Sequence, residues 1–356
     1  MDLNYYVLRI IFQYLNGFDL HNASKVSRSW SEIANDEKQT RGPMCIIKSK
    51  DRKSDSIDYE VIQKEIIKCC KVKPSLSMLF IKIESKEDIA GKCYCKYLPF
   101  NWYSPVVGSY LPRTEKNTVL WMFFPEVPNI KITTLTFVPY KLIWGNGIYC
   151  HEIKANFNLS FTNADRLKTV FESVYNFDQR TVDRKSCLIL LCDRNGALIT
   201  SNLENALRSW YPNKRLPVWG GIVDYLSICH HMPHTSVSNE TMFCIAVLIS
   251  GEGLNTWSTF LYCNCNTQKK IERKLKSFKD RITLKKHSIG FMFNPHFRSY
   301  LSCLESTTFK QIFPGVPLVE YSGIGAFGGI DSEPYTRIIN KLNLFDKTAF
   351  MVITYD

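Results

Sequence analysis

The chain has 356 residues, of which 45% are hydrophobic and 13% aromatic, and 45 basic against 33 acidic residues give a net charge of +12. This composition excludes a disordered or fibrous chain and predicts a globular protein of two or three domains. No apolar run reaches the eighteen or so residues of a membrane helix, and no basic leader precedes a cleavable segment. We therefore expect an intracellular protein, cytoplasmic or nuclear, that does not contact a membrane.

The first predicted element is a helix within VLRIIFQYLNGFDLHNASKVSRSW (7–30), and its apolar side is unusually wide. Four residues have the spacing of a core-facing stripe: Leu8, Ile11, Phe12 and Leu15. Three others form a second apolar strip beside the first: Val7, Ile10 and Tyr14. The combined arc spans roughly 200°, about twice what a helix packed on one core needs. The helix therefore has two apolar surfaces to bury.

Two more short helices follow. Asn16-Gly17 ends the first helix, Asp19 is a candidate cap for the second, and Ser27 or Ser29 can cap the third. Three helices within about forty residues bury little surface of their own. The surplus apolar face predicts a partner, which is either the rest of the chain or another protein.

Residues 1–42 resemble an F-box, the helical motif by which substrate receptors dock onto the Skp-type adaptor of cullin-based ubiquitin ligases. The matching residues are Leu3, Val7, Leu8, Ile11, Phe12, Leu15, Asp19, Leu20, Val26, Arg28, Trp30 and Ile33. Two positions depart from the usual pattern, with Asn4 in place of a proline and Tyr6 in place of an acidic residue. The resemblance implies the following adaptor-binding residues: Leu3, Val7, Leu8, Ile10, Ile11, Phe12, Leu15, Leu20, Val26 and Trp30. The alternative is an ordinary three-helix cap folded back on the remaining chain.

Beyond residue 42 the pattern mixes strands and helices. A helix around residues 61–67 is ended by Pro74, and another is predicted over 163–177. Runs rich in β-branched and aromatic residues predict strands at 75–83, 117–124 and 130–138, and the apolar run SCLILLC predicts another at 186–192. The fold class is therefore α+β, with a three-helix unit followed by a mixed α/β body.

The densest charge lies in QKKIERKLKSFKDRITLKK (268–286), where Ile271, Leu275, Phe278 and Ile282 repeat at helical spacing. This pattern predicts an amphipathic helix with a basic outer face. The face is either simply solvated or a docking site for an acidic partner. We expect no nucleic-acid partner, because exposed aromatic residues are not interleaved with the charges.

An internal repeat is predicted, since residues 186–222 align without a gap on residues 288–324. The offset of 102 places Tyr211-Pro212 on Phe313-Pro314 and Gly221 on Gly323. The shared plan is a strand, a helix ended by an aromatic-proline pair, a short strand and a glycine. This duplication predicts two halves, 43–232 and 238–356, with a seam at 230–239.

Two segments of the second half are HSIGFMF (287–293) and TTFKQIFPGVPLVEYSGIGAFGG (307–329). They resemble the C-terminal part of a FIST domain, a sensory module of signal-transduction proteins. Bacterial relatives are thought to bind small ligands such as amino acids, which implies a ligand or substrate turn at Gly323, Gly325, Gly328 and Gly329. Ile324 and Ala326 depart from the common asparagine and glutamate of the family.

Sites for nucleotides, metals and catalysis are scarce. Gly323, Gly325 and Gly328 match a dinucleotide fingerprint, but Gly329 and Pro334 interrupt the helix that must follow. Thirteen cysteines, odd in number and irregularly placed, predict free thiols. The pairs Cys93-x-Cys95 and Cys263-x-Cys265 are too closely spaced for a usual zinc site, and His230, His231 and His234 lie in a loop-like segment. We expect neither cofactor, metal nor enzymatic activity.

The sequence thus predicts a non-catalytic substrate receptor of a Skp–cullin–F-box ubiquitin ligase. Its partners would be the adaptor, the cullin scaffold and a protein target held by the FIST-like body. The alternatives are a ligand-sensing or signal-transduction module with no ligase role, and an enzyme using a histidine or cysteine.

Overall fold

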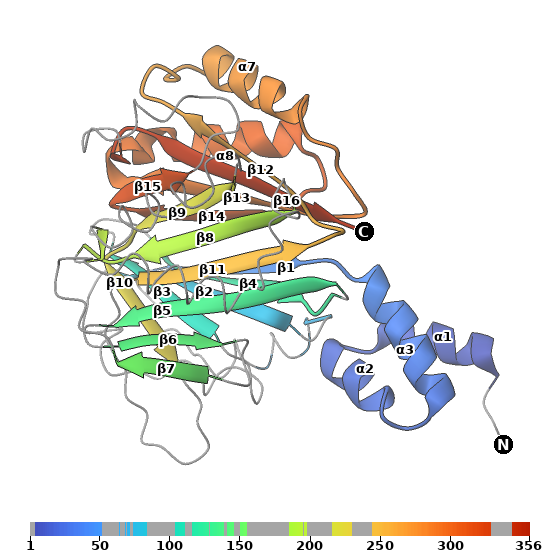
Figure 1. Cartoon of the computed structure of the whole chain (residues 1–356). Coiled ribbons are helices and arrows are strands. Elements are labelled where there is room, and N and C mark those ends of the chain that lie inside the picture. Colours follow the sequence, from blue (N-terminus) through green and yellow to red (C-terminus); the bar gives the residue numbers. More distant parts are fainter. Residues whose placement is uncertain are drawn as a thin grey trace.

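A computed structural model describes residues 4–51, 64, 68, 70–71, 74–83, 104–110, 116–127, 129–138, 141–145, 150–154, 185–194, 196–197, 216–229, 244–328 and 344–356. Three N-terminal helices lie beside a larger body that contains three β-sheets and, among the described residues, two more α-helices (Figure 1). The expected mixture of helix and sheet after a three-helix unit is confirmed. None of the helices in these ranges is long and apolar enough to cross a membrane.

The three N-terminal helices are α1 (Tyr5–Tyr14), α2 (Gly17–Ala23) and α3 (Arg28–Thr40). A side chain caps each of them: Asn4 accepts from Tyr6 N, Asn16 from Phe18 N, and Ser27 from Trp30 N. The prediction of Ser27 is confirmed, whereas Asp19 is not the cap of α2. Asn16 lies just outside α2 and caps it, because its side-chain oxygen accepts hydrogen bonds from the free N–H groups of Phe18 and Asp19.

The strands of the body form three sheets. Sheet A contains β1 (Met44–Asp51), β2 (Pro74–Ile83), β3 (Ser104–Tyr110), β4 (Lys116–Pro125) and β10 (Tyr225–Cys229). Sheet B contains β5 (Ile130–Val138), β6 (Lys141–Gly145), β7 (Cys150–Lys154), β8 (Ser186–Cys192), β9 (Val218–Ile222), β11 (Cys244–Gly251) and β15 (Gly325–Gly328). Sheet C contains β12 (Asn255–Leu261), β13 (His287–Pro295), β14 (Leu318–Gly323) and β16 (Thr348–Tyr355).

All three sheets contain the same four-stranded unit. The orders β1-β4-β2-β3, β5-β11-β8-β9 and β12-β16-β13-β14 all place the fourth strand of the unit between the first and the second. In each unit the second and third strands are parallel, and the other neighbours are antiparallel. The body is therefore a threefold repetition of one topology, where the sequence suggested a twofold one.

A proline marks the same register point in each unit. Pairing with the second strand begins directly after Pro105, Pro217 and Pro317, at Leu79–Val106, Leu188–Val218 and Gly290–Leu318. Leu188 N and Gly290 N donate to the carbonyls of Pro217 and Pro317, at 2.9 and 2.8 Å. Leu188 and Gly290 are 102 positions apart but the two prolines are 100 apart, so the gapless alignment is wrong for β9 and β14. Descent of the units from one ancestral sequence stays a prediction.

Two strands link neighbouring sheets. After β9 the chain leaves sheet B and pairs as β10 with β3 of sheet A, and after β14 it leaves sheet C and pairs as β15 with β9 of sheet B. Strand β11 lies between β5 and β8, although the predicted seam at 230–239 would assign it to the other half. The hydrogen-bonded ladder of sheet B is thus continuous across the predicted division of 43–232 from 238–356.

One hydrophobic core joins all three sheets. The ring of Phe80 in sheet A lies 4.7 Å from that of Tyr321 in sheet C, and Trp219 of sheet B lies 5.0 Å from Phe291 of sheet C, measured between ring centroids. Every residue of β8 is buried, which explains its unbroken apolar run SCLILLC.

Two helices form the outer layer over sheet C. α8 (Ser299–Ile312) follows the short 3-10 turn η3 (His296–Arg298) and contacts β13 and β14, and α7 (Gln268–Lys279) packs on α8 (Figure 1). The predicted stripe of Ile271, Leu275 and Phe278 is fully buried. The helix ends at Lys279 and not at 286, and Ile282 packs against the same core from the following segment.

Candidate functional site

The apolar residues of α1 divide into an inner and an outer set. Leu8 and Phe12 are 3% and 1% exposed, whereas Val7, Ile10 and Ile11 are 43%, 57% and 42% exposed. Ile11 was predicted to face the core, and it lies instead at the outer edge of the helix. At 100° per residue, Ile11 falls about 80° from the direction midway between Leu8 and Phe12, which is too far to enter a narrow core.

The core of the three helices is too small to bury more of α1. It contains six buried residues, Leu8, Phe12, Leu20, Ala23, Ile33 and Ala34, with Leu15 and Trp30 packed at its edge. The rings of Phe12 and Trp30 meet edge to face, with centroids 5.3 Å apart. Small residues such as Ala23 and Ala34 bring the helices close together, so nothing inside accommodates the second apolar strip.

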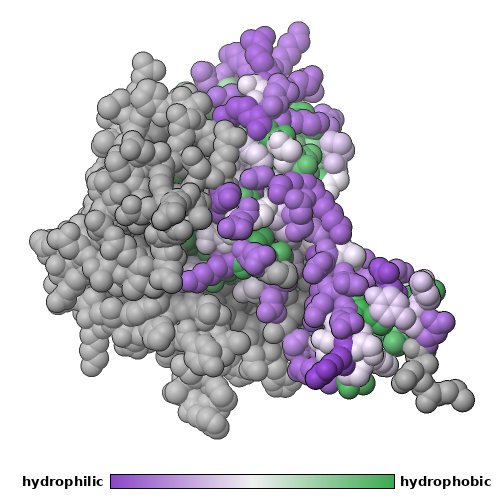
Figure 2. Space-filling view, turned by 45° about the vertical axis from the view of Figure 1, so that its right-hand side comes forward, coloured by the Kyte–Doolittle hydropathy of each residue, from purple (hydrophilic) through white to green (hydrophobic). Residues whose placement is uncertain are grey.

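The exposed strip is the largest collection of its kind among the described residues. Of eleven large hydrophobic side chains exposed there, six lie on α1 and a seventh, Val26, lies in the turn between α2 and α3; the six are Tyr5, Tyr6, Val7, Ile10, Ile11 and Tyr14. Figure 2 shows apolar surface interrupted by polar groups on this part of the molecule. Five of the α1 residues, Tyr6, Val7, Ile10, Ile11 and Tyr14, share one side of the helix, and we call them the α1 outer face. Tyr5 lies on the opposite side, where its hydroxyl donates to Asp36 of α3 at 3.4 Å. A cluster of exposed apolar side chains on one helix is typical of a protein-binding surface.

The predicted adaptor-binding residues therefore fall into three groups. Val7, Ile10, Ile11 and Val26 are exposed; Leu8, Phe12 and Leu20 are core residues; Leu15 and Trp30 are partly buried. Leu3 lies outside the described residues. The sequence-based set missed three exposed tyrosines, Tyr5, Tyr6 and Tyr14. Tyr14 was detectable, because it follows Val7 and Ile10 at intervals of seven and four residues.

Arg41 joins the N-terminal helices to the body. Its guanidinium is buried, forms an ion pair with Glu37 at 2.9 Å and donates to the Phe12 carbonyl at the end of α1 at 2.8 Å. It also donates to the carbonyl of Lys71, just before β2. One planar side chain thus connects α1, α3 and the body, as only arginine with its five donors can do.

Two further hydrogen bonds cross the same junction. Gly17 N donates to the Cys70 carbonyl at 2.7 Å, and His287 Nε2 donates to the Gln39 carbonyl at 3.0 Å. The His287 ring packs against Tyr355 of β16, with centroids 5.2 Å apart. A Cβ atom on Gly42 would lie 2.7 Å from His287 Nδ1, so only glycine permits this close approach. The helices are therefore held to the body by directed hydrogen bonds.

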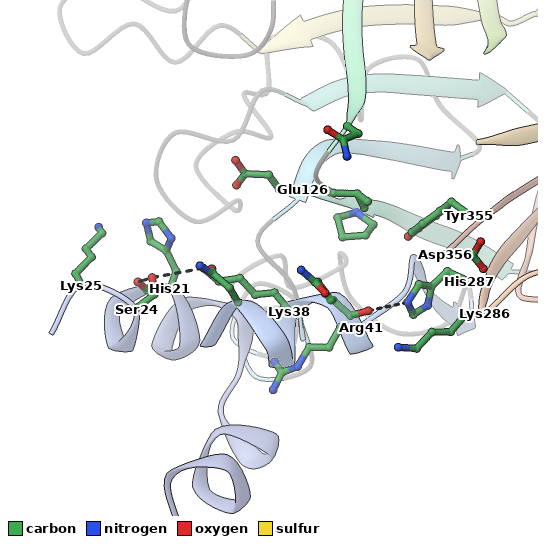
Figure 3. Close-up of a pocket in the computed structure, with 15 residues that line it drawn as sticks. His21, Ser24, Lys25, Lys38, Arg41, Glu126, Lys286, His287, Tyr355 and Asp356 are labelled. Atoms are coloured by element: carbon green, nitrogen blue, oxygen red, sulfur yellow. Dashed lines mark hydrogen bonds between the residues drawn. The ribbon is translucent and has the colours of Figure 1, made fainter. Parts of the chain in front are cut away.

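A cavity of about 860 Å³ opens beside this junction, between α2 and α3 on one side and the body on the other (Figure 3). Its charged lining residues include Lys25, Lys38 and Lys286 against Glu126 and Asp356. The volume suits a drug-sized molecule or a short peptide segment.

The glycines predicted to form a ligand turn lie in two buried strands. Gly323 ends β14, and Gly325 and Gly328 belong to β15; all three are buried. A Cβ atom at Gly323 would lie 2.5 Å from the Ile222 carbonyl oxygen, and one at Gly328 would lie 2.5 Å from the Phe260 ring. Close packing accounts for Gly323 and Gly328 without a ligand. Residues 329–343, where a phosphate-holding helix would have to begin, lie outside the described residues. Gly329 lies outside the described residues.

The thiols and metal-ligand candidates offer little chemistry. Burial raises the pKa of the Cys45 thiol to about 12, and burial also raises the pKa of the Cys187 thiol, so both stay protonated at neutral pH. No group of three histidine, cysteine, aspartate or glutamate side chains could hold a metal ion within the described ranges. Cys93, Cys95, His230, His231 and His234 lie outside those ranges.

Comparison with known proteins gives one domain assignment. The F-box domain model matches residues 1–41. No curated protein matches the chain. Among solved structures, the cyanuric acid hydrolase from A. caulinodans is 10% identical, with a TM-score of 0.37, over 88% of this chain and 99% of that one. The helices α1 to α3, with their small shared core and exposed α1 outer face, are an F-box domain.

Proposed function

We propose that this protein is the substrate receptor of a Skp–cullin–F-box ubiquitin ligase. F-box domains bind Skp-type adaptors within cullin-based ligases, and residues 1–41 match that domain. The observation that carries the proposal is the α1 outer face, whose apolar side chains have no place in the F-box core. The face would bind the adaptor, and the body would bind a protein target.

Such a receptor needs no catalytic group of its own. It raises the effective concentration of a target's lysines near a charged ubiquitin conjugate, and the conjugating machinery supplies the chemistry. The directed contacts of Arg41 agree with this role. A firmly held F-box limits the positions that a bound target can occupy relative to the adaptor.

The body is proposed to be FIST-like. The segments 287–293 and 307–329 support this assignment, and an F-box followed by FIST segments resembles the layout of F-box only protein 22. The proposed FIST-like segments are 43–232 and 238–356, two parts of one body because β11 joins them in sheet B, and the site of action is proposed to be cytoplasmic or nuclear.

Co-expression of the full chain with a Skp-type adaptor, followed by size-exclusion chromatography, tests the proposal. A stable one-to-one complex is expected with the wild type. The double variant Val7→Glu/Ile10→Glu should fold and lose the complex, because both side chains already face water. Phe297→Glu/Tyr300→Glu is the matched control, since these side chains are 76% and 74% exposed on the body.

Two outcomes would reject the receptor assignment. One is a wild-type chain that elutes alone in the presence of adaptor. The other is an equal yield of complex from Val7→Glu/Ile10→Glu and from the control.

A second candidate function is ligand sensing, which the junction cavity favours. A ligand bound there would contact the F-box and the body together. Thermal unfolding with a panel of amino acids and organic acids tests it, since a ligand that binds only the folded state raises the melting temperature. Lys286→Ala should abolish that shift, and a shift that survives this variant would place the ligand elsewhere.

A further inference from the structure

Helix α7 has a strongly basic outer surface. Residues 268–286 contain nine lysines and arginines against only Glu272 and Asp280, a net charge of +7 out of the +12 of the whole chain. On the helix itself the cations are Lys269, Lys270, Arg273, Lys274, Lys276 and Lys279. We call the first five of them the α7 basic face.

The apolar side of α7 is unavailable to any partner. Ile271, Leu275 and Phe278 are all 0% exposed, because they pack on the core beneath the helix. Insertion into a lipid surface needs exposed apolar groups, and stacking of unpaired bases needs exposed aromatic rings. The α7 basic face has neither, so it can attract a partner through charge alone.

The charges are arranged at a cost to the helix itself. Lys269 and Arg273, and likewise Lys270 and Lys274, are like charges four residues apart, which destabilises a helix. The first turn contains no acidic residue, and Thr267 makes no side-chain cap hydrogen bond, so Lys269 and Lys270 lie at the unfavourable positive end of the helix dipole.

Among the described residues, few anionic groups neutralise these cations. The one ion pair on α7 within those residues joins Lys276 and Glu272 at 2.6 Å, and its side chains are 62% and 41% exposed. Lys279 instead donates to the Ile312 carbonyl at 2.6 Å, which anchors the end of α7 to α8. A face kept only for solubility would gain from mixed signs, whereas this one concentrates a single sign.

We propose that the α7 basic face is a docking surface for an acidic segment of a protein. Figures 1 and 2 place α7 at the end of the body away from the F-box helices, so an acidic segment could bind while α1 holds the adaptor. Identifying this segment as part of a ubiquitination target rests on the proposed function. Binding of acidic protein sequence to the face does not.

Fluorescence anisotropy with the full chain and a labelled peptide of eight glutamates flanked by glycine and serine tests the proposal. We expect binding at low salt that weakens roughly tenfold between about 0.05 and 0.3 M salt. Lys270→Glu/Arg273→Glu should reduce the affinity at least tenfold. Lys64→Glu/Lys68→Glu makes the same change in net charge on two exposed helical lysines outside α7 and the F-box, and should alter the affinity less than twofold.

Three results would overturn this assignment: no binding of the peptide at low salt, equal losses in the two variants, or tighter binding of a DNA duplex of equal charge. Co-purification of Lys270→Glu/Arg273→Glu with the adaptor is measured in parallel. Adaptor binding with no peptide binding contradicts only the docking surface, whereas peptide binding with no adaptor binding contradicts only the receptor function.

Discussion

The amphipathic helices α1 and α7 differ in how much of their apolar surface the protein itself buries. On α1, a small core buries Leu8 and Phe12 and leaves Val7 and Ile10 exposed, while on α7 a larger core buries every large apolar residue and leaves only charge outside. Covering an exposed apolar strip with a partner is favourable by about 25 cal/mol per Å² of apolar surface removed from water. An exposed charged face is stable in water. α1 therefore has apolar surface left for a partner to bury, whereas α7 can attract a partner only through its charges.

The largest expected effect is a loss of F-box stability. Phe12→Ala should cost about 3–5 kcal/mol of F-box stability, because it empties the centre of a core of six buried residues. Hydrogen exchange of the amides of residues 4–41 measures the loss. Phe297→Ala, on an exposed ring of the body, should leave the same amides unchanged. Protected F-box amides in Phe12→Ala would mean that the core is supported from elsewhere.

Variants of the F-box core cannot be used to test adaptor contacts. Substituting Leu8 and Phe12 by alanine would abolish adaptor binding through unfolding, so it cannot identify a contact residue. Substitutions on the α1 outer face avoid this problem.

Loss of the junction arginine should have the next largest effect. Arg41→Ala leaves Glu37 and the carbonyls of Phe12 and Lys71 without their buried donor, at a cost of about 2–4 kcal/mol. Urea unfolding of the full chain measures it, and exchange should rise at the end of α1. Arg41→Lys keeps the charge but cannot reach all three acceptors, so it should recover less than half. Full recovery by lysine would show that charge alone holds the junction.

A single charge on the α1 outer face should have an intermediate effect on binding and almost none on folding. Ile10→Glu should weaken adaptor binding by about 2 kcal/mol or more, roughly 30-fold, because it places a charge within an apolar contact. Its unfolding free energy should change by less than about 0.5 kcal/mol. Isothermal titration with purified adaptor and urea unfolding give the two numbers. An unchanged affinity would exclude Ile10 from the interface.

The smallest expected effect is a change in the stability of α7 when one of its lysines is replaced. Lys269→Glu should stabilise the helix by about 0.3–1 kcal/mol, because it puts a negative charge at the positive end of the helix dipole. It should also weaken binding of the acidic peptide. Thermal unfolding and anisotropy should therefore move in opposite directions. A stabilised variant with unchanged peptide binding would indicate that the face is only solvated.

The local elements could be read from the sequence. Helical spacing located α1 and the buried stripe of α7, Ser27 was one of two candidates for the cap of α3, β-branched and aromatic runs located β2, β4 and β5, and an apolar run located β8. These features depend on neighbours within a few residues, so periodicity and side-chain chemistry are sufficient to find them.

Which of these surfaces stay exposed and how the strands combine depend on packing between distant parts of the chain. The placement of Ile11 outside depends on the size of a core built from three helices, and the third repeat depends on hydrogen bonds between strands far apart in the chain. The contacts of Arg41 and His287 join positions separated by 30 and 248 residues. No local pattern records such pairings, because they arise from packing of the whole chain.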